Sequence, residues 1–188
     1  MIERGVAAGL ILFAAATAPP WVAEAVRAGS TPAKLEAYSV PGLAITYTTP
    51  FLRVARAANA AVRAGRPFGV ADVEAKAYAP ELRLLVGVRA VTEGGRLLAT
   101  AGPKSIRLLV GAGEIKASRI DAGTMKQTVT IEGGAPDEVT AGVLKAVFPI
   151  AGSPPRGAFL EITYTAMRDG RAETIVERAA LDFQKTRW

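Results

Sequence analysis

Apolar and polar residues alternate with a period of two in several segments of this 188-residue chain, and no other feature constrains the fold as strongly. Successive side chains of a β-strand point to opposite faces, so this alternation predicts strands with one buried face. About seven to nine such segments, spaced by roughly 8–12 residues, favour an antiparallel sandwich. The residues expected to face inward in the clearest segments are Leu43, Ile45, Tyr47, Leu82, Leu84, Val86, Val88, Ile106, Leu108, Val110, Leu160, Ile162 and Tyr164.

Glycine-containing turns predict two hairpins between these strands. Glu93-Gly94-Gly95-Arg96 forms the first turn, and Asp169-Gly170 forms the second. Three other segments, "EIKASRI", "KQTVTIE" and "GVLKAVFPI", are predicted strands. "DAGTM" is expected to separate the first two, and "EGGAPDE" is expected to be a loop.

The period changes to 3.6 residues between positions 50 and 64, which predicts one amphipathic helix. Thr49 can cap this helix, Pro50 suits its first turn, and Gly65 with Pro67 ends it. We expect the apolar face to pack over an end or edge of the sheets, because it would otherwise stay in water. That face consists of Phe51, Val54, Ala55, Ala58, Ala61 and Val62.

The amino-terminal segment has the features of an export signal. Arg4 precedes the uncharged run 6–18, and Ala23-Glu24-Ala25 has the small-x-small pattern that signal peptidase recognises. We therefore predict a signal peptide over residues 1–25, cleaved after Ala25, a linker over 26–34 and a single domain with a helical insertion over 35–188. Ala18 is a poorer cleavage site because Pro19 follows it, and an uncleaved signal anchor is the alternative.

The chain contains no cysteine and no histidine. These absences exclude disulfides, thiolate metal sites, and Cys-His and Ser-His-Asp catalysis. We expect a soluble periplasmic or secreted protein that has no cofactor, no metal and no transmembrane anchor in its mature form.

Paired carboxylates are the remaining acid–base candidates, since a glycosidase needs only two. Glu132, Asp137 and Glu138 cluster in sequence, and Glu161, Glu173 and Glu177 lie on the last strands. A carboxylate-dependent hydrolase of envelope glycans is therefore one alternative function.

Arginines on the predicted helix and just after it form a candidate patch for an anionic partner. The candidates are Arg53, Arg56, Arg63 and Arg66, extended by Arg83 and Arg89 from the strand that follows. An acidic polysaccharide, a lipid headgroup or an acidic envelope protein would suit them. Nucleic acid is not expected, because aromatic residues are 6% of the chain and most occupy apolar strand positions. The same arginines also suit a solvated helix face with no partner.

The strand rhythm, with phrases such as "AVFPIAG" and "FLEITYT", resembles exported bacterial immunoglobulin-like β-sandwich proteins of unassigned function. This resemblance implies a mainly β, antiparallel immunoglobulin-like sandwich, without the Cys…Trp…Cys pattern of antibody domains, and it implies no particular activity. We expect a non-enzymatic accessory or binding module of the cell envelope. A structural subunit of an envelope assembly is a further alternative.

Overall fold

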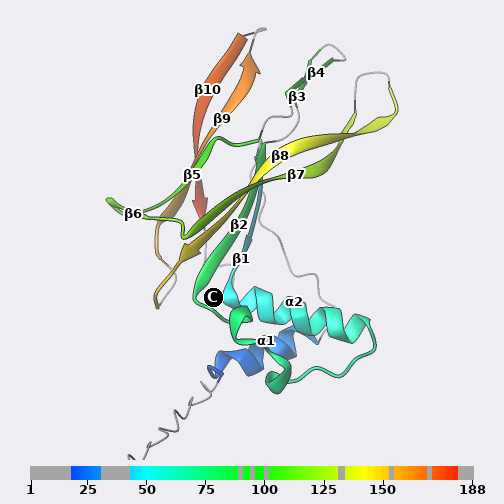
Figure 1. Ribbon diagram of the computed structural model, residues 1–188, viewed down its shortest axis with the longest axis vertical. Helices are drawn as coiled ribbons and strands as arrows, with labels where there is room; N and C mark the ends of the chain where they lie inside the picture. Colours follow the sequence, from blue (N-terminus) through cyan, green and yellow to red (C-terminus); the bar gives the residue numbers. More distant parts are fainter. Residues whose placement is uncertain are drawn as a thin grey trace, which may run out of the picture.

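Two antiparallel four-stranded sheets and two helices make up the described part of the protein (Figure 1). The computed structural model describes residues 18–30, 43–88, 91–93, 96–99, 102–130, 134–152, 155–168 and 171–181. The first sheet has the order β1-β2-β8-β7, and the second has the order β10-β9-β5-β6. The first sheet contains β1 (Leu43–Thr48), β2 (Glu81–Val88), β7 (Arg119–Thr130) and β8 (Pro136–Pro149). The second contains β5 (Ser105–Val110), β6 (Gly113–Ile115), β9 (Ala158–Arg168) and β10 (Arg171–Leu181).

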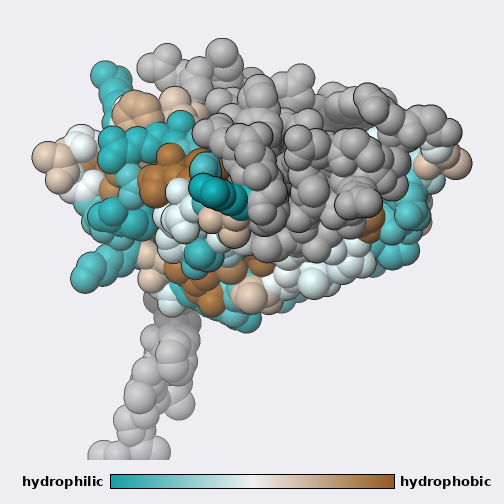
Figure 2. Space-filling model, turned by 90° about the horizontal axis from the view of Figure 1, so that it is seen from above, coloured by the Kyte–Doolittle hydropathy of each residue, from teal (hydrophilic) through white to brown (hydrophobic). Residues whose placement is uncertain are grey.

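The facing sides of the two sheets share one hydrophobic core, which agrees with a β-sandwich. Alternate residues of β1, β2, β5 and β9 enter this core as the sequence predicts, except that Val110 is only partly buried. Phe148 and Ala146 of β8 complete it from the centre of the first sheet. At the end of the sheets away from the helices, hydrophilic and hydrophobic residues are interspersed over the described surface (Figure 2).

Both predicted hairpins are confirmed by strand pairing. β3 (Val91–Glu93) pairs with β4 (Arg96–Ala99), and β9 pairs with β10 through Arg168 and Arg171. The turn residues 94–95 and 169–170 lie outside the described residues.

The segment 113–130 differs from the prediction. The expected strand "EIKASRI" is divided, because β6 joins the second sheet and β7 begins at Arg119 in the first. β7 then continues through "DAGTM", where a break was expected. Continuous pairing of β7 with β8 stabilises this segment more than its glycine disfavours a strand. Pro136, Asp137 and Glu138, expected in a loop, belong to β8 for the same reason.

The predicted helix is present as α2 (Pro50–Arg63), inserted between the paired strands β1 and β2. The Thr49 side chain caps it by accepting a hydrogen bond of 3.2 Å from the Leu52 amide. Two short 3₁₀ turns, η1 (Val70–Asp72) and η2 (Ala75–Ala77), lead back to β2.

The apolar face of α2 packs on a second helix and not over the sheets, which corrects the expectation from sequence. This helix, α1 (Trp21–Gly29), lies beside α2 at one end of the sheets (Figure 1). Phe51, Val54 and Ala58 form a separate hydrophobic core with α1, while Val62 is 46% exposed. Val26–Gly29, expected in a linker, are therefore helical. None of the described helices is long and apolar enough to cross a membrane.

Candidate anion-binding groove

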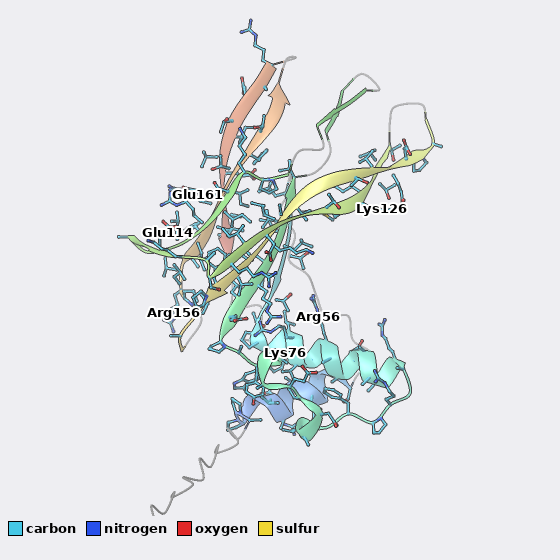
Figure 3. The ribbon with its side chains drawn as sticks, in the orientation of Figure 1. Arg56, Lys76, Glu114, Lys126, Arg156 and Glu161 are labelled. Atoms are coloured by element: carbon cyan, nitrogen blue, oxygen red, sulfur yellow. The ribbon has the colours of Figure 1, made fainter. Side chains whose placement is uncertain are left out.

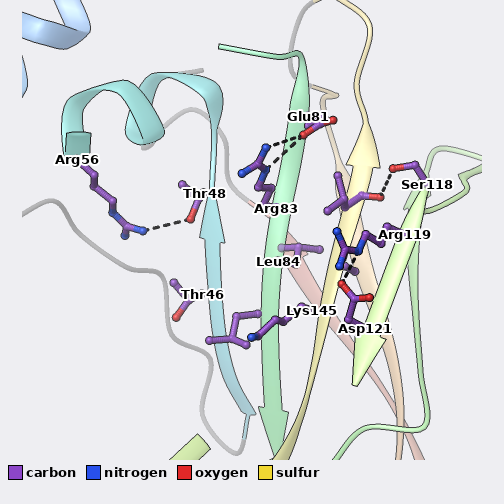
Figure 4. Close-up of a pocket in the computed structure, with 13 residues that line it drawn as sticks. Thr46, Thr48, Arg56, Glu81, Arg83, Leu84, Ser118, Arg119, Asp121 and Lys145 are labelled. Atoms are coloured by element: carbon purple, nitrogen blue, oxygen red, sulfur yellow. Dashed lines mark hydrogen bonds and ion pairs between the residues drawn. The ribbon is translucent and has the colours of Figure 1, made fainter. Parts of the chain in front are cut away.

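A groove with a volume of about 610 Å³ lies on the outer face of the first sheet, next to α2 (Figure 4). Strand register explains which side chains meet there. Thr48, Arg83, Val147 and Arg119 form one row across β1, β2, β8 and β7. Thr46, Leu85, Lys145 and Asp121 form the adjacent row. Residues far apart in sequence therefore line one surface.

Arg56 reaches the groove from α2. Its guanidinium donates a hydrogen bond of 3.2 Å to Oγ1 of Thr48 on β1. Figure 4 shows Arg56 at the β1 side of the groove and Arg119 with Asp121 at the β7 side. Cationic groups from a helix and from three strands thus approach the same space.

The groove carries more positive than negative charge. Arg83 pairs with Glu81 at 3.1 Å and Arg119 pairs with Asp121 at 2.6 Å, each within its own strand. Arg56 and Lys145 form no ion pair with any residue that the structure describes. The lining therefore keeps two uncompensated cations, which an anionic group can neutralise.

Of the four arginines predicted to form the patch, Arg53, Arg56, Arg63 and Arg66, only Arg56 lines the groove. Arg63 and Arg66 are exposed near the carboxyl end of α2 and do not belong to its lining. Arg83 lines it as well, and Arg89 lies outside the described residues.

Arg53 has a structural role instead. Its guanidinium donates to the carbonyl oxygens of Ala77 at 2.9 Å and Glu81 at 2.7 Å, and also to that of Ala79. Burial, followed by repulsion from Arg83, lowers the pKa of Arg53 to about 10, so the group stays protonated at neutral pH. Arg53 therefore joins α2 to the segment that enters β2 and is not available to a ligand.

Arg119, Lys145 and Asp121 were missed by sequence reasoning. Alternation within β8 assigns Lys145 to the outer face, but only the register with β2 and β7 shows its neighbours. The alternation of residues thus predicts the face of the sheet on which Lys145 lies, whereas its neighbours in the groove depend on the pairing of distant strands.

A charge ladder occupies the outer face of the second sheet (Figure 3). Glu161 accepts hydrogen bonds from Arg178 and from Arg107, each at 2.9 Å, and Arg107 also pairs with Glu114 at 2.8 Å. The hydrogen bond from Arg178, with Arg107 beside it, lowers the pKa of Glu161 below its ordinary value. Glu161 is only 8% exposed, but both of its carboxylate oxygens accept hydrogen bonds from arginines, so it stays ionised. This is the behaviour of a structural carboxylate.

Among the described residues, the other acidic candidates have separate partners. Glu177 accepts a hydrogen bond of 3.0 Å from the Tyr164 hydroxyl, and Glu138 pairs with Lys126 at 2.7 Å. Glu173 and Asp137 are exposed, and Glu132 lies outside the described residues. Within the described ranges, no group of three or more acidic side chains is placed to hold a metal ion.

Comparison with protein-family models, with curated proteins and with solved structures gives no match to this chain.

Proposed function

We propose that the protein is an exported, non-enzymatic accessory or binding module of the bacterial cell envelope, working in the periplasm or after secretion. We further propose that it binds an anionic partner in the groove between α2 and β7. The observation that carries this proposal is the pair of cations, Arg56 and Lys145, which have no ion-pair partner among the described residues and lie on the two sides of Leu85 and Thr46. Charges held in this way raise the local concentration of anions and favour their binding.

The groove suits a carboxylate or phosphate group carried on a larger molecule. Its volume of about 610 Å³ falls in the range of small-molecule sites, roughly 300–1,000 Å³. Leu85 and Val147, which are partly exposed, add apolar surface between the charges. An acidic polysaccharide and an anionic lipid headgroup both present such a group next to less polar atoms.

The order of the strands supports an immunoglobulin-like assignment. If the strands are lettered along the chain with the β3–β4 hairpin left out, β1-β2-β8-β7 corresponds to A-B-E-D. β10-β9-β5 then corresponds to G-F-C, with β6 added at its edge. This fold serves many binding proteins as a scaffold, so the assignment agrees with a binding role and specifies no ligand.

Direct binding measurements test the proposal. The purified protein is titrated with polygalacturonate and with vesicles containing phosphatidylglycerol, against neutral dextran and phosphatidylcholine vesicles. We expect one anionic probe to bind, with an affinity that falls as salt rises because exposed charges are screened.

The decisive comparison uses two double variants with the same change in net charge. Arg56→Gln with Lys145→Gln alters the groove, whereas Arg63→Gln with Arg66→Gln alters exposed arginines outside it. We expect the first to weaken binding about tenfold, equivalent to about 1.4 kcal/mol, and the second by less than about twofold. Equal losses would indicate unspecific attraction to net positive charge, and no binding of either anion would reject the groove as a site for these ligands.

The hydrolase and the structural subunit stay predictions from sequence. Release of reducing ends from envelope glycan would support the hydrolase. Self-association of the protein in sedimentation would support the subunit.

A further inference from the structure

Helix α1 belongs to the folded domain through a core of its own. Val22 and Ala25 have no exposed surface, and neither do Val54, Ala55 and Ala58 on the facing side of α2. The rings of Trp21 and Phe51 extend this contact, with centroids 6.4 Å apart. The expected cleavage site after Ala25 lies in the middle of this packed helix.

The two helices approach most closely at Gly29. A Cβ atom at that position would lie 2.1 Å from the carbonyl oxygen of Ala55 and 2.8 Å from the Cβ of Ala58. Only glycine fits such a separation. Asn59 of α2 also donates a hydrogen bond of 3.1 Å to the Gly29 carbonyl, which satisfies an acceptor at the end of α1. Shape and hydrogen bonding therefore both fix α1 against α2.

Cleavage after Ala25 would remove two of the three buried side chains that α1 contributes to this core, Val22 and Ala25, and leave only Val26. Trp21, Val22 and Ala25 would be lost, and Val26–Gly29 alone are too short to hold a helix. The apolar side of α2 would then face water. The peptidase acts on the chain before it folds, so burial does not itself protect the bond; the folded product is what requires α1.

We propose that α1 is retained in the mature protein, and that any removal of the amino-terminal segment takes place at or before Ala18. Ala16-Thr17-Ala18 has the same small-x-small pattern as the site ending at Ala25, although Pro19 disfavours a cut there, so an uncleaved chain is the other form that keeps α1. A cut there leaves Pro19 as the first residue, directly ahead of α1. This proposal is independent of what binds in the groove.

The intact mass of the exported protein tests the proposal directly. The full chain is expressed with its own amino terminus in a bacterial host, recovered from the envelope fractions and weighed by mass spectrometry. A mature chain that begins at Met1 or at Pro19 supports retention of α1. A chain that begins at Val26 overturns it.

A pair of glycine variants in the full chain gives a second, independent measurement. Gly29→Ala introduces the clash with Ala55, whereas Gly113→Ala places its Cβ 3.6 Å from the nearest atom. Alanine in place of a helical glycine normally stabilises, so an unpacked α1 predicts an unchanged or higher Tm for Gly29→Ala. We expect its Tm to fall by about 5 °C or more and that of Gly113→Ala to change by about 1–2 °C. An unchanged or higher Tm for Gly29→Ala would overturn the proposal.

Discussion

Replacement of Arg53 by methionine should weaken the fold and leave the groove intact. Methionine keeps much of the length of the side chain but has no donor, so the carbonyl oxygens of Ala77, Ala79 and Glu81 lose their shared partner. These three carbonyls belong to the segment that connects η2 to β2. The variant therefore tests whether a guanidinium, and not only apolar packing, joins α2 to the first sheet.

The magnitude follows from the hydrogen bonds. Each typically contributes about 0.5–1.5 kcal/mol net, and Arg53 is half-buried, so water can replace part of what is lost. Three such bonds give an expected loss of about 2–3 kcal/mol in the free energy of unfolding. For a chain of this size, that loss lowers Tm by about 4–12 °C.

Thermal and urea unfolding of matched variants measure this effect. Arg63→Met, at an exposed position of the same helix, should change the free energy of unfolding by less than about 0.5 kcal/mol. Arg53→Lys should lose most of what Arg53→Met loses, because an ammonium lacks the planar fork that reaches three carbonyls. If Arg53→Met melted with Arg63→Met, or if Arg53→Lys melted with the wild type, the structural role of Arg53 would be refuted.

Three further predictions concern the charge ladder, the core between α1 and α2, and a close backbone approach of Gly102 to Gly142. Because its arginine partners lower the pKa of Glu161, its contribution to stability is complete above about pH 4.5 and is lost as pH falls through the folded pKa. Glu161→Gln should thus be less stable than wild type at pH 7, and the difference in Tm should shrink below pH 4.5; a constant difference would contradict this. Phe51→Asp should lose at least the roughly 1.5–3 kcal/mol from burying the ring, measured by urea unfolding, and a wild-type midpoint would contradict the packing of α2 on α1. Gly102→Ala should lower Tm more than Gly113→Ala, since its Cβ would lie 2.6 Å from the Gly142 carbonyl carbon; equal melting would contradict that close approach.

Local signals were sufficient to predict α2, both hairpins and the inward faces of β1, β2 and β9. Thr49 and Pro50 fix the start of α2 by capping and by a preset backbone angle, which depend only on neighbouring residues. The continuous β7 was not predicted, because pairing with β8 across the sheet overrides the turn tendency of "DAGTM".

Helix α1 was not predicted, because its residues also match a cleavage pattern. Ala23 and Ala25 match the small-x-small pattern of signal peptidase sites, and small residues also let two helices approach closely. In the structure, Gly29 lies directly against Ala55, and Ala25 is buried in the core that α1 shares with α2. The local sequence cannot distinguish a cleavage site from a helix-packing face, because the helix that packs on these residues begins more than twenty positions later.

The contrast between the outer faces of the two sheets is the strongest argument for where the proposed anionic partner would bind. On the second sheet, Arg178, Glu161, Arg107 and Glu114 alternate in sign, so this ladder is internally neutral. In the groove on the first sheet, Glu81 and Asp121 pair with arginines of their own strands, which leaves Arg56 of α2 and Lys145 of β8 uncompensated among the described residues. The charges of the ladder balance one another without a ligand. The groove has a deficit of negative charge that an anionic partner would supply, so the first sheet is the face on which binding should be sought.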